Sequence, residues 1–202
     1  MLKISHLDEN TELLGPFKRF VIWVHGCCFD CEGCMALNTR YGDYEEISEI
    51  NLAEKIIKSD TEGITISGGE PFLQAEALAN LIHEVKKNRD IGVILYSGFT
   101  LEELKVRSEF EDLLSCSDIL IDGKYIKELD NGRAYIGSSN QRLHFITERY
   151  KGIAPEYYSS YKRKAEIKIK QGKIFLIGVP SRETLEIWQK LKEKFVCYSQ
   201  SI

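Results

Sequence analysis

The sequence lacks any apolar run of the roughly 20 residues that a membrane-spanning helix needs. Its start, from Met1 to Gly15, also lacks the apolar core of a secretory signal peptide. It has no excess of positive charge, and its net charge of −4 argues against bulk binding of nucleic acid. We find no internal repeat and no low-complexity segment. We therefore expect a cytoplasmic globular protein that binds neither a membrane nor nucleic acid.

The charge that is present is distributed unevenly. Between Arg149 and Lys173 there are eight Lys or Arg against two Glu, so this segment has a charge of +6 and the rest of the chain about −10. Two interpretations stay open. The segment is either a solvated strand face or a docking surface for an acidic partner.

Cysteines are few, but four of the six lie in the stretch HGCCFDCEGC, from His25 to Cys34. Cytoplasmic thiols are normally reduced, so clustered cysteines favour a metal or redox site over disulfides. The other two, Cys116 and Cys197, stand alone in apolar surroundings. We expect both to be small buried hydrophobic residues.

Short apolar strands alternate with helical patterns through most of the chain. Strands are predicted at 19–24, 63–67, 91–97, 118–123 and 143–146, and helices at 47–59, 74–87 and 100–115. This alternation is typical of an α/β protein with a parallel sheet covered by helices. The strands are too few for a closed eight-fold barrel, so the pattern predicts a partial, open β/α barrel.

The pattern changes after about residue 147. A hairpin is predicted over 165–180, followed by a helix over 181–195 with Ser181 as its cap and an apolar stripe on one side. We therefore divide the chain into a core of residues 1–148 and a hairpin-helix extension of residues 149–202 that packs on it.

The cysteine cluster begins at the carboxyl end of the first predicted parallel strand, which is where ligands bind in such sheets. Structural zinc sites use two separated ligand pairs, and a ferredoxin run has a fourth cysteine followed by proline. A CxxC redox motif needs only two thiols. The best fit is an iron–sulfur cluster with three protein ligands and one open iron. Spacing leaves two triplets possible, Cys27 or Cys28 together with Cys31 and Cys34.

A second motif, TISGGEP at 65–71, follows the second predicted strand. Its glycines allow the backbone to approach a ligand closely, and Glu70 supplies a negative charge. Taken alone, the motif could be a strand-to-helix turn with Pro71 at the first helical position. Both motifs, however, are expected at the same edge of one sheet.

The pair of motifs, Cx3Cx2C followed by GGEP, resembles the signature of the radical S-adenosylmethionine enzymes. The resemblance selects Cys27, Cys31 and Cys34 as ligands of a 4Fe-4S cluster and leaves Cys28 as a spare residue. It implies that S-adenosylmethionine binds the fourth iron, with Glu70 beside its ammonium group. It further implies reductive cleavage to methionine and a 5′-deoxyadenosyl radical that abstracts a hydrogen atom. No protein acid, base or nucleophile is then required, and we expect His25 to be structural.

Further stretches are similar to the activating enzymes of anaerobic ribonucleotide reductase. They are CEGC (31–34), YSGFTLEEL (96–104), DILIDGKYIKEL (118–129) and GSSNQRL (137–143). By this resemblance the cofactor-binding residues are Gly33, Gly68, Gly69, Glu70, Ser97, Asp122 and Lys124. Asn140 to Arg142 would lie at the far rim of the same site.

The implied activity is removal of a hydrogen atom from a glycine of a partner glycyl radical enzyme, such as anaerobic ribonucleotide reductase. Flavodoxin or ferredoxin is the implied reductant. An alternative is direct modification of a small molecule or peptide, as in enzymes similar to 7-carboxy-7-deazaguanine synthase or in peptide-modifying members. A third hypothesis is a non-catalytic iron–sulfur carrier, which would leave the GGEP motif unexplained.

Overall fold

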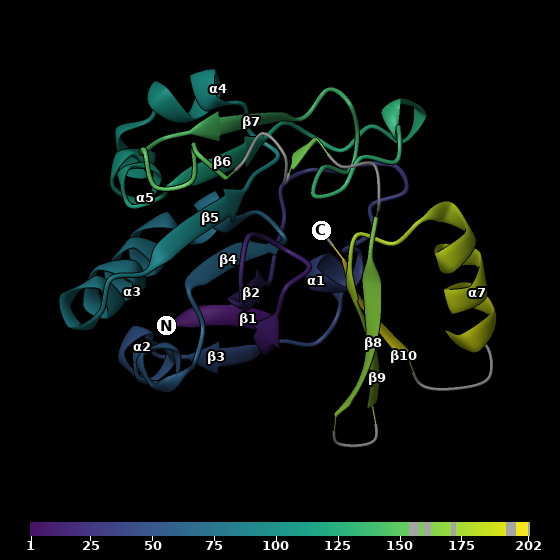
Figure 1. Cartoon of the computed structure of the whole chain (residues 1–202), viewed down its shortest axis with the longest axis horizontal. Coiled ribbons are helices and arrows are strands. Elements are labelled where there is room, and N and C mark those ends of the chain that lie inside the picture. Colours follow the sequence, from purple (N-terminus) through teal and green to yellow (C-terminus); the bar gives the residue numbers. More distant parts are fainter. Residues whose placement is uncertain (154–157, 160–162, 171–172, 193–196, 202) are drawn as a thin grey trace.

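The computed structural model describes residues 1–153, 158–159, 163–170, 173–192 and 197–201 (Figure 1). Within this part of the chain there are two sheets. The larger has the strand order β3-β1-β2-β4-β5-β6-β7, and the smaller has the order β10-β9-β8. The larger sheet contains β1 (Leu2–Thr11), β2 (Arg19–Val24), β3 (Glu45–Ile47), β4 (Gly63–Gly68), β5 (Gly92–Tyr96), β6 (Ile119–Asp122) and β7 (Arg142–Phe145).

The centre of the large sheet is parallel, as predicted. β2, β4, β5 and β6 run in one direction, while β7 on one side and β1 and β3 on the other are antiparallel to their neighbours. The four central strands are buried along nearly their whole length. The protein is therefore of the α/β class, with a large and mostly parallel sheet.

Helices cover one face of this sheet. They are α2 (Glu49–Lys58), α3 (Ala75–Asn88), α4 (Leu101–Lys105) and α5 (Glu111–Ser115), with 3-10 turns at Pro71–Gln74, Ser108–Phe110 and Lys127–Leu129. The short helix α1 (Asn38–Tyr41) lies instead beside β1 and the smaller sheet. The main apolar core lies between α2, α3, α5 and the sheet, and it includes Ile22, Ile66 and Leu95. Alternate residues of the same strands, such as Trp23 and Ile121, pack on the opposite face.

All five predicted strands are present, but the fifth, β7, is antiparallel to its neighbour. The helices expected at 47–59 and 74–87 are α2 and α3. The stretch 100–115 is not one helix, because α4 ends before Val106 and the backbone of Arg107 is extended. The Arg107 guanidinium lies 5.0 Å from the ring centre of Phe99 and 5.3 Å from that of Phe110, which favours the break.

The extension contains the expected hairpin and helix together with one strand that the sequence did not predict. β8 (Ala165–Lys170) and β9 (Lys173–Gly178) are antiparallel, α7 spans Arg182–Lys192, and β10 (Cys197–Ser201) pairs in parallel with β9. The Ser181 hydroxyl caps α7 by accepting from the Thr184 amide at 3.2 Å. In Figure 1 this unit stands on the side of the large sheet opposite α2, α3 and α5, with Phe175 and Ile177 packed against Trp23. The predicted turn at 171–172 and the side chain of Cys197 lie outside the described residues.

The amino ends of the parallel strands meet around one buried cation, Arg19. Its five N–H donors make five hydrogen bonds, to Thr65, Glu62, Tyr150 and the carbonyl oxygens of Ile64 and Gly92. Arg149 adds an ion pair to Glu62 at 3.2 Å. Arg149 and Tyr150, the first residues of the expected extension, thus contact the core directly.

Among the described residues, no helix combines the length and the apolar character needed to cross a membrane.

Candidate functional site

The loops that follow β2, β4, β5 and β6 leave the sheet at the same edge, because these strands are parallel. The first two of these loops are joined by backbone hydrogen bonds. The Gly69 amide donates to Val24 O at 2.9 Å, and the Glu70 amide donates to Gly26 O at 2.8 Å. A Cβ atom on Gly69 would lie 1.9 Å from Gly26 O. The close approach that requires this glycine is therefore to the cysteine loop itself.

The cysteine loop has no regular secondary structure from Gly26 to Cys31. Cys27, Cys31 and Cys34 are half-buried, whereas Cys28 is exposed. Positive φ angles of 93° at Gly26 and 74° at Gly33 let the chain turn on both sides of the thiols. Three partly enclosed thiols on one loop are a donor set that suits an iron–sulfur cluster.

Two of these thiols, Cys27 and Cys34, hold their protons more tightly than an ordinary cysteine. Burial raises the pKa of Cys27 to about 11, and the neighbouring thiols of Cys28 and Cys34 add to the rise. Burial also raises the pKa of Cys34, with a contribution from Cys31. Iron binding must therefore displace the protons of Cys27 and Cys34.

The Glu70 carboxyl lies beneath the loop and is 0% exposed. Its Oε1 accepts from the Phe72 amide at 3.0 Å and from Ser97 Oγ at 2.9 Å, while Oε2 accepts from the Gly98 amide at 2.8 Å. Desolvation nevertheless raises its pKa to about 7. Two predicted cofactor residues, Glu70 and Ser97, are thus bonded to each other and join the loops after β4 and β5. Contact of Glu70 with an ammonium group stays a prediction.

Asp122, at the end of β6, is also 0% exposed. It accepts from the Leu101 amide at 2.6 Å and from Arg142 at 2.5 and 3.1 Å, and lies 3.0 Å from Nε2 of His144. Burial alone would raise the pKa of Asp122, but Arg142 holds it below its ordinary value. The carboxylate fastens β6 to β7 and to the start of α4, and its contact with the cofactor stays a prediction.

Lys124 and Gly33 connect the β6 end to the cysteine loop. Lys124 Nζ lies 4.8 Å from the ring centre of Phe29, and a Cβ on Gly33 would meet the Lys127 side chain at 3.3 Å. Phe29 also packs edge-on against Phe99, at 4.8 Å between ring centres. All the predicted cofactor residues therefore lie at one edge, either in the cysteine loop or in loops that contact one another around it.

The predicted rim folds back onto the loop after β6. Gln141 donates to Gly123 O at 2.9 Å, and Asn140 Nδ2 donates to Lys124 O at 2.8 Å. The other amide atom, Asn140 Oδ1, is buried and accepts no hydrogen bond from the described residues. A buried acceptor without a partner among the described residues is uncommon, so Asn140 Oδ1 marks a part of the rim where a polar group could bind.

The extension braces this rim, which sequence reasoning did not predict. Arg163, from the segment before β8, donates to the carbonyl oxygens of Arg133, Ile136 and Gly137 at 3.0–3.2 Å and forms a buried ion pair with Asp130 at 2.7 Å. Its only signal in the sequence was membership of a basic segment. The extension therefore helps to hold the loop that leads into GSSNQRL.

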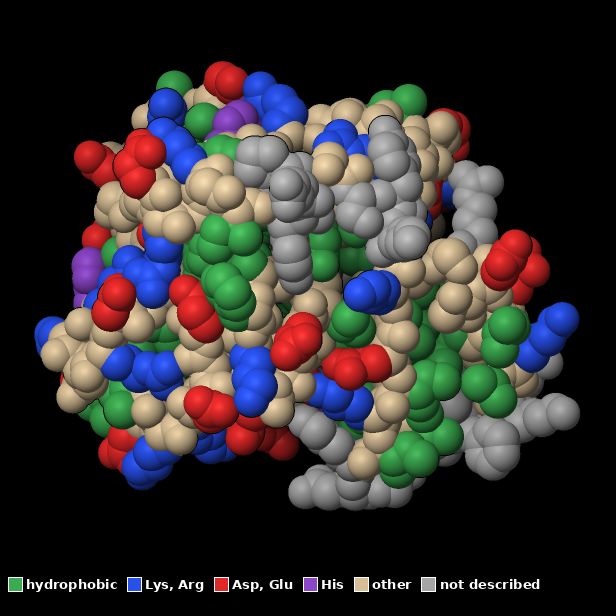
Figure 2. All heavy atoms as spheres, in the orientation of Figure 1, with side chains coloured by type: hydrophobic (Ala, Val, Ile, Leu, Met, Phe, Trp, Pro, Cys, Tyr) green, Lys and Arg blue, Asp and Glu red, His purple; other side chains and the backbone are tan. Residues whose placement is uncertain are grey.

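Much of the basic segment is paired within the protein. Besides Arg149 and Arg163, Lys168 pairs with Asp8 at 2.8 Å, and Lys151 pairs with Glu148. Figure 2 shows acidic and basic side chains interspersed over one face of the molecule. These pairs reduce the charge that the segment can offer to a partner.

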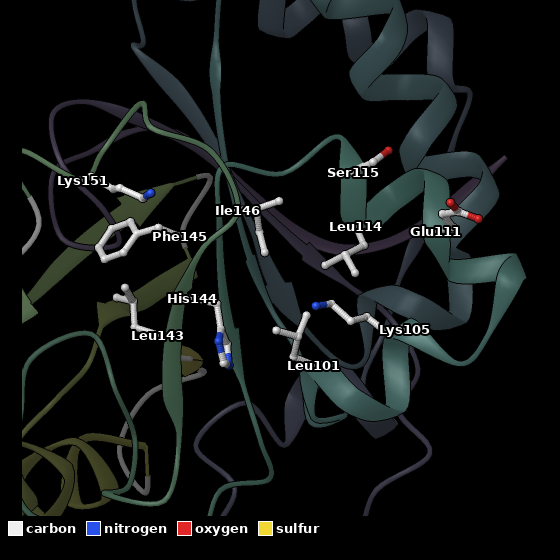
Figure 3. Close-up of a pocket in the computed structure, with 10 residues that line it drawn as sticks. All are labelled: Leu101, Lys105, Glu111, Leu114, Ser115, Leu143, His144, Phe145, Ile146 and Lys151. Carbon is white, nitrogen blue, oxygen red and sulfur yellow. The ribbon is translucent and has the colours of Figure 1, made fainter.

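The surface has two sizeable cavities, of which one borders the cysteine loop and the other does not. One of about 620 Å³ lies between α4, α5 and β7 and is lined by Leu101, Leu114, His144 and Phe145 among others (Figure 3). A second, of about 510 Å³, borders the start of the cysteine loop at His25 and Gly26. Neither of these two cavities is lined by a cysteine.

Comparisons with known proteins agree with this geometry. A family model described as a 4Fe-4S single cluster domain matches residues 13–144, which include both motifs and stop before the extension. The anaerobic ribonucleoside-triphosphate reductase-activating protein of Enterobacteria phage T4 is 35% identical over 136 residues, covering 64% of this chain and 85% of the relative. Its counterpart in Vibrio cholerae is 33% identical over 143 residues, covering 66% and 91%.

A third relative is the pyruvate formate-lyase-activating enzyme of Streptococcus mutans. It is 28% identical over 155 residues, covering 70% of this chain and 59% of the relative. The family match spans more than half of the chain, and the first two relatives are matched over most of their own length. The chain therefore belongs to the radical S-adenosylmethionine family of 4Fe-4S enzymes that activate glycyl radical enzymes.

Proposed function

We propose that this enzyme generates the glycyl radical of an anaerobic ribonucleotide reductase in the cytoplasm. It does so with S-adenosylmethionine and a 4Fe-4S cluster held by Cys27, Cys31 and Cys34. The observation that carries the proposal is the joining of the cysteine loop to the GGEP turn through Gly69 and Glu70, at the carboxyl edge of the sheet. The same two motifs lie in the region matched by the reductase-activating relatives.

The chain's own residues would bind the cluster and S-adenosylmethionine, orient them and enclose the site. When bound, the cluster and S-adenosylmethionine supply the one-electron reduction and the hydrogen-atom abstraction. Gly68 and Gly69 allow the turn to lie against the cysteine loop, and Glu70 fixes that turn to Ser97. Lys124 and Asn140 place a cation and a free acceptor at the rim, where they can orient a polar cofactor.

The architecture suits a protein substrate. We propose that the large sheet is a partial β/α barrel, whose curvature ends at the antiparallel strand β7. A backbone loop of the partner would enter at the carboxyl edge over Asn140 to Arg142, and the partner itself would exclude water from the reaction. Flavodoxin or ferredoxin would supply the electron.

The test is anaerobic incubation of the cluster-loaded enzyme with a reductant, S-adenosylmethionine and the ribonucleotide reductase of the same genome. We expect a glycyl radical doublet in the electron paramagnetic resonance spectrum. Cys31→Ala should lose both the iron and the doublet. Cys28→Ala, the matched control in the same loop, should keep both.

Two results would contradict the proposal. Loss of the cluster in Cys28→Ala, with retention in Cys27→Ala, would show that the ligand triplet is wrong. Absence of the doublet, together with 5′-deoxyadenosine formation on a small molecule or peptide, would place the enzyme in the alternative class.

A further inference from the structure

A second group of metal-binding side chains lies outside the cysteine loop, in the helical layer. His83 projects from α3, Asp112 from α5, and Cys116 follows the last turn of α5. His83 Nε2 is 2.9 Å from Asp112 Oδ1 and 3.5 Å from Cys116 Sγ, and the last two atoms are 4.0 Å apart. α3 and α5 are neighbours in the layer that covers the sheet (Figure 1).

The three donor atoms have the spacing of ligands around one small cation. Tetrahedral Zn²⁺ with ordinary bond lengths separates a nitrogen and an oxygen ligand by about 3.3 Å, and sulfur from either by about 3.5 Å. The circle through the three donor atoms has a radius of about 2.1 Å, close to a Zn–N or Zn–O bond and slightly below a Zn–S bond. A cation could therefore contact all three with shifts of a few tenths of an ångström.

The arrangement is one of chelation rather than of a catalytic relay. In a Cys–His–Asp relay the two partners bond to different ring nitrogens. Here both Asp112 and Cys116 are nearest to the same nitrogen, Nε2 of His83, since the sulfur lies farther from Nδ1, at 3.8 Å. Convergence on a single ring nitrogen is what a shared cation requires.

The surroundings allow a cation to enter and a water to complete its coordination. Cys116 is only 5% exposed, whereas the side chains of His83 and Asp112 are 49% and 61% exposed. The nearby Lys86 ammonium is engaged by Cys116 O at 2.8 Å. Asp112 and Cys116 are one helical turn apart, so α5 fixes their separation and α3 supplies the third ligand.

We propose that His83, Asp112 and Cys116 form a mononuclear Zn²⁺ site that clips α3 to α5 and is independent of the iron–sulfur cluster. A mixed nitrogen, oxygen and sulfur set with one open position suits zinc, and imidazole with thiolate disfavours the hard cations Mg²⁺ and Ca²⁺. Cys116 is buried, as its sequence context predicts, and has in addition two ligand side chains beside it.

The experiment measures metals in cluster-loaded protein, so that Cys27, Cys31 and Cys34 are already occupied. A Cys28→Ala background removes the exposed thiol of the loop. After anaerobic exposure to one equivalent of Zn²⁺ and desalting, mass spectrometry should find about one zinc per chain besides the iron. His83→Ala and Cys116→Ala should each lose the zinc and keep the iron. Glu84→Ala, on the same helix, should keep both.

Two further measurements guard against a folding defect in Cys116→Ala. Co²⁺ should give the visible bands of tetrahedral cobalt and a thiolate-to-metal band, both absent in His83→Ala. Zn²⁺ should raise the thermal midpoint of the parent protein but not of Asp112→Asn. Absence of zinc from the parent protein, or its retention in both His83→Ala and Cys116→Ala, would overturn the proposal.

Discussion

The two edges of the parallel sheet are built in opposite ways. At the amino edge, one buried guanidinium satisfies all of its donors with groups from β4, from Glu62 just before it, from the start of β5 and from Tyr150. At the carboxyl edge, thiols lie half-exposed on a loop without regular structure, and Asn140 keeps an acceptor free. The amino edge is thus closed by internal hydrogen bonds, whereas the carboxyl edge combines the bonded carboxylates of Glu70 and Asp122 with half-exposed thiols.

The strand β4 shows the contrast within one element. Gly63 at its start and Gly69 just after its end both lack room for a side chain, with a Cβ falling 1.9 Å from the nearest atom in each case. At Gly63 that atom is Nη1 of Arg19, whereas at Gly69 it is Gly26 O in the cysteine loop. The same residue type thus serves stability at one edge and site geometry at the other.

The largest effect is expected from breaking the amino edge. Arg19→Met leaves carbonyl oxygens and the Glu62 carboxylate without their buried partner, and it should cost about 3–5 kcal/mol in the free energy of unfolding. Urea unfolding of cluster-free protein measures it. Lys18→Met, which removes an exposed pair with Asp60, is the control and should change stability by less than about 0.5 kcal/mol.

If the edges are as separate as they look, Arg19→Met should bind a normal amount of iron in its folded fraction. A decrease of less than about 1 kcal/mol in the free energy of unfolding, or a loss of iron from the folded protein, would contradict this separation of the two edges.

The next effect concerns the pH dependence of stability at the carboxyl edge. The pKa of Glu70 rises from 4.5 to about 7 on folding, so the folded state holds a proton that the unfolded state has released between these values. Its contribution to stability is therefore present below about pH 4.5 and is lost as the pH rises to about 7, by about 3 kcal/mol.

Glu70→Gln should remove this contribution, so that its stability falls less than that of the wild type between pH 5 and pH 7.5. Urea unfolding of both proteins at several pH values gives the difference. Glu54→Gln, on the exposed side of α2, should behave as the wild type. If the stability of Glu70→Gln fell with pH as steeply as that of the wild type, another group would be responsible.

Gly63 at the start of β4 and Gly69 just after its end provide a sharper test with a smaller effect. Gly63→Ala and Gly69→Ala should each destabilise the chain by about 1–3 kcal/mol through overpacking. Only Gly69→Ala should also reduce the iron content and S-adenosylmethionine binding of the folded protein, because it displaces the cysteine loop. Equal cofactor binding by both variants would show that the turn does not position the loop.

The smallest effect is expected from salt. If the basic segment steered the partner, screening would slow activation as the ionic strength rises. Because Arg149, Arg163 and Lys168 already have acidic neighbours, we expect a decrease of only about two- to threefold between low and physiological salt. Activation rates at a series of salt concentrations measure it, and a tenfold decrease would restore the steering interpretation.

Local signals predicted the central strands and the positions of both motifs. Apolar runs such as RFVIWV need no knowledge of the rest of the chain, and a motif after a parallel strand has to lie at the carboxyl edge. The edge strands β1, β3 and β10 were missed. β1 mixes charged residues with Leu2 and Ile4, and it is a strand because β2 and β3 lie beside it.

The side chains that fix the site could not be predicted for the same reason. Contact of Glu70 with a cofactor stays a prediction, whereas its three donors within the protein come from Phe72, Ser97 and Gly98, two of them from the loop after another strand. Arg163 holds a loop that precedes it by about 30 residues, as the separations in its hydrogen bonds show. Such pairings depend on the folded arrangement, which residue spacing does not encode.

The bond between Arg19 and Tyr150 spans 131 residues, and this has a consequence for the order of assembly during synthesis. A ribosome makes Arg19 and the cysteine loop early and Tyr150 late, so the nascent chain cannot complete its amino edge until three quarters of it has emerged. Contacts between such distant residues form slowly because a long loop must close first. The thiols thus leave the ribosome well before the contacts that close the amino edge of the sheet can form.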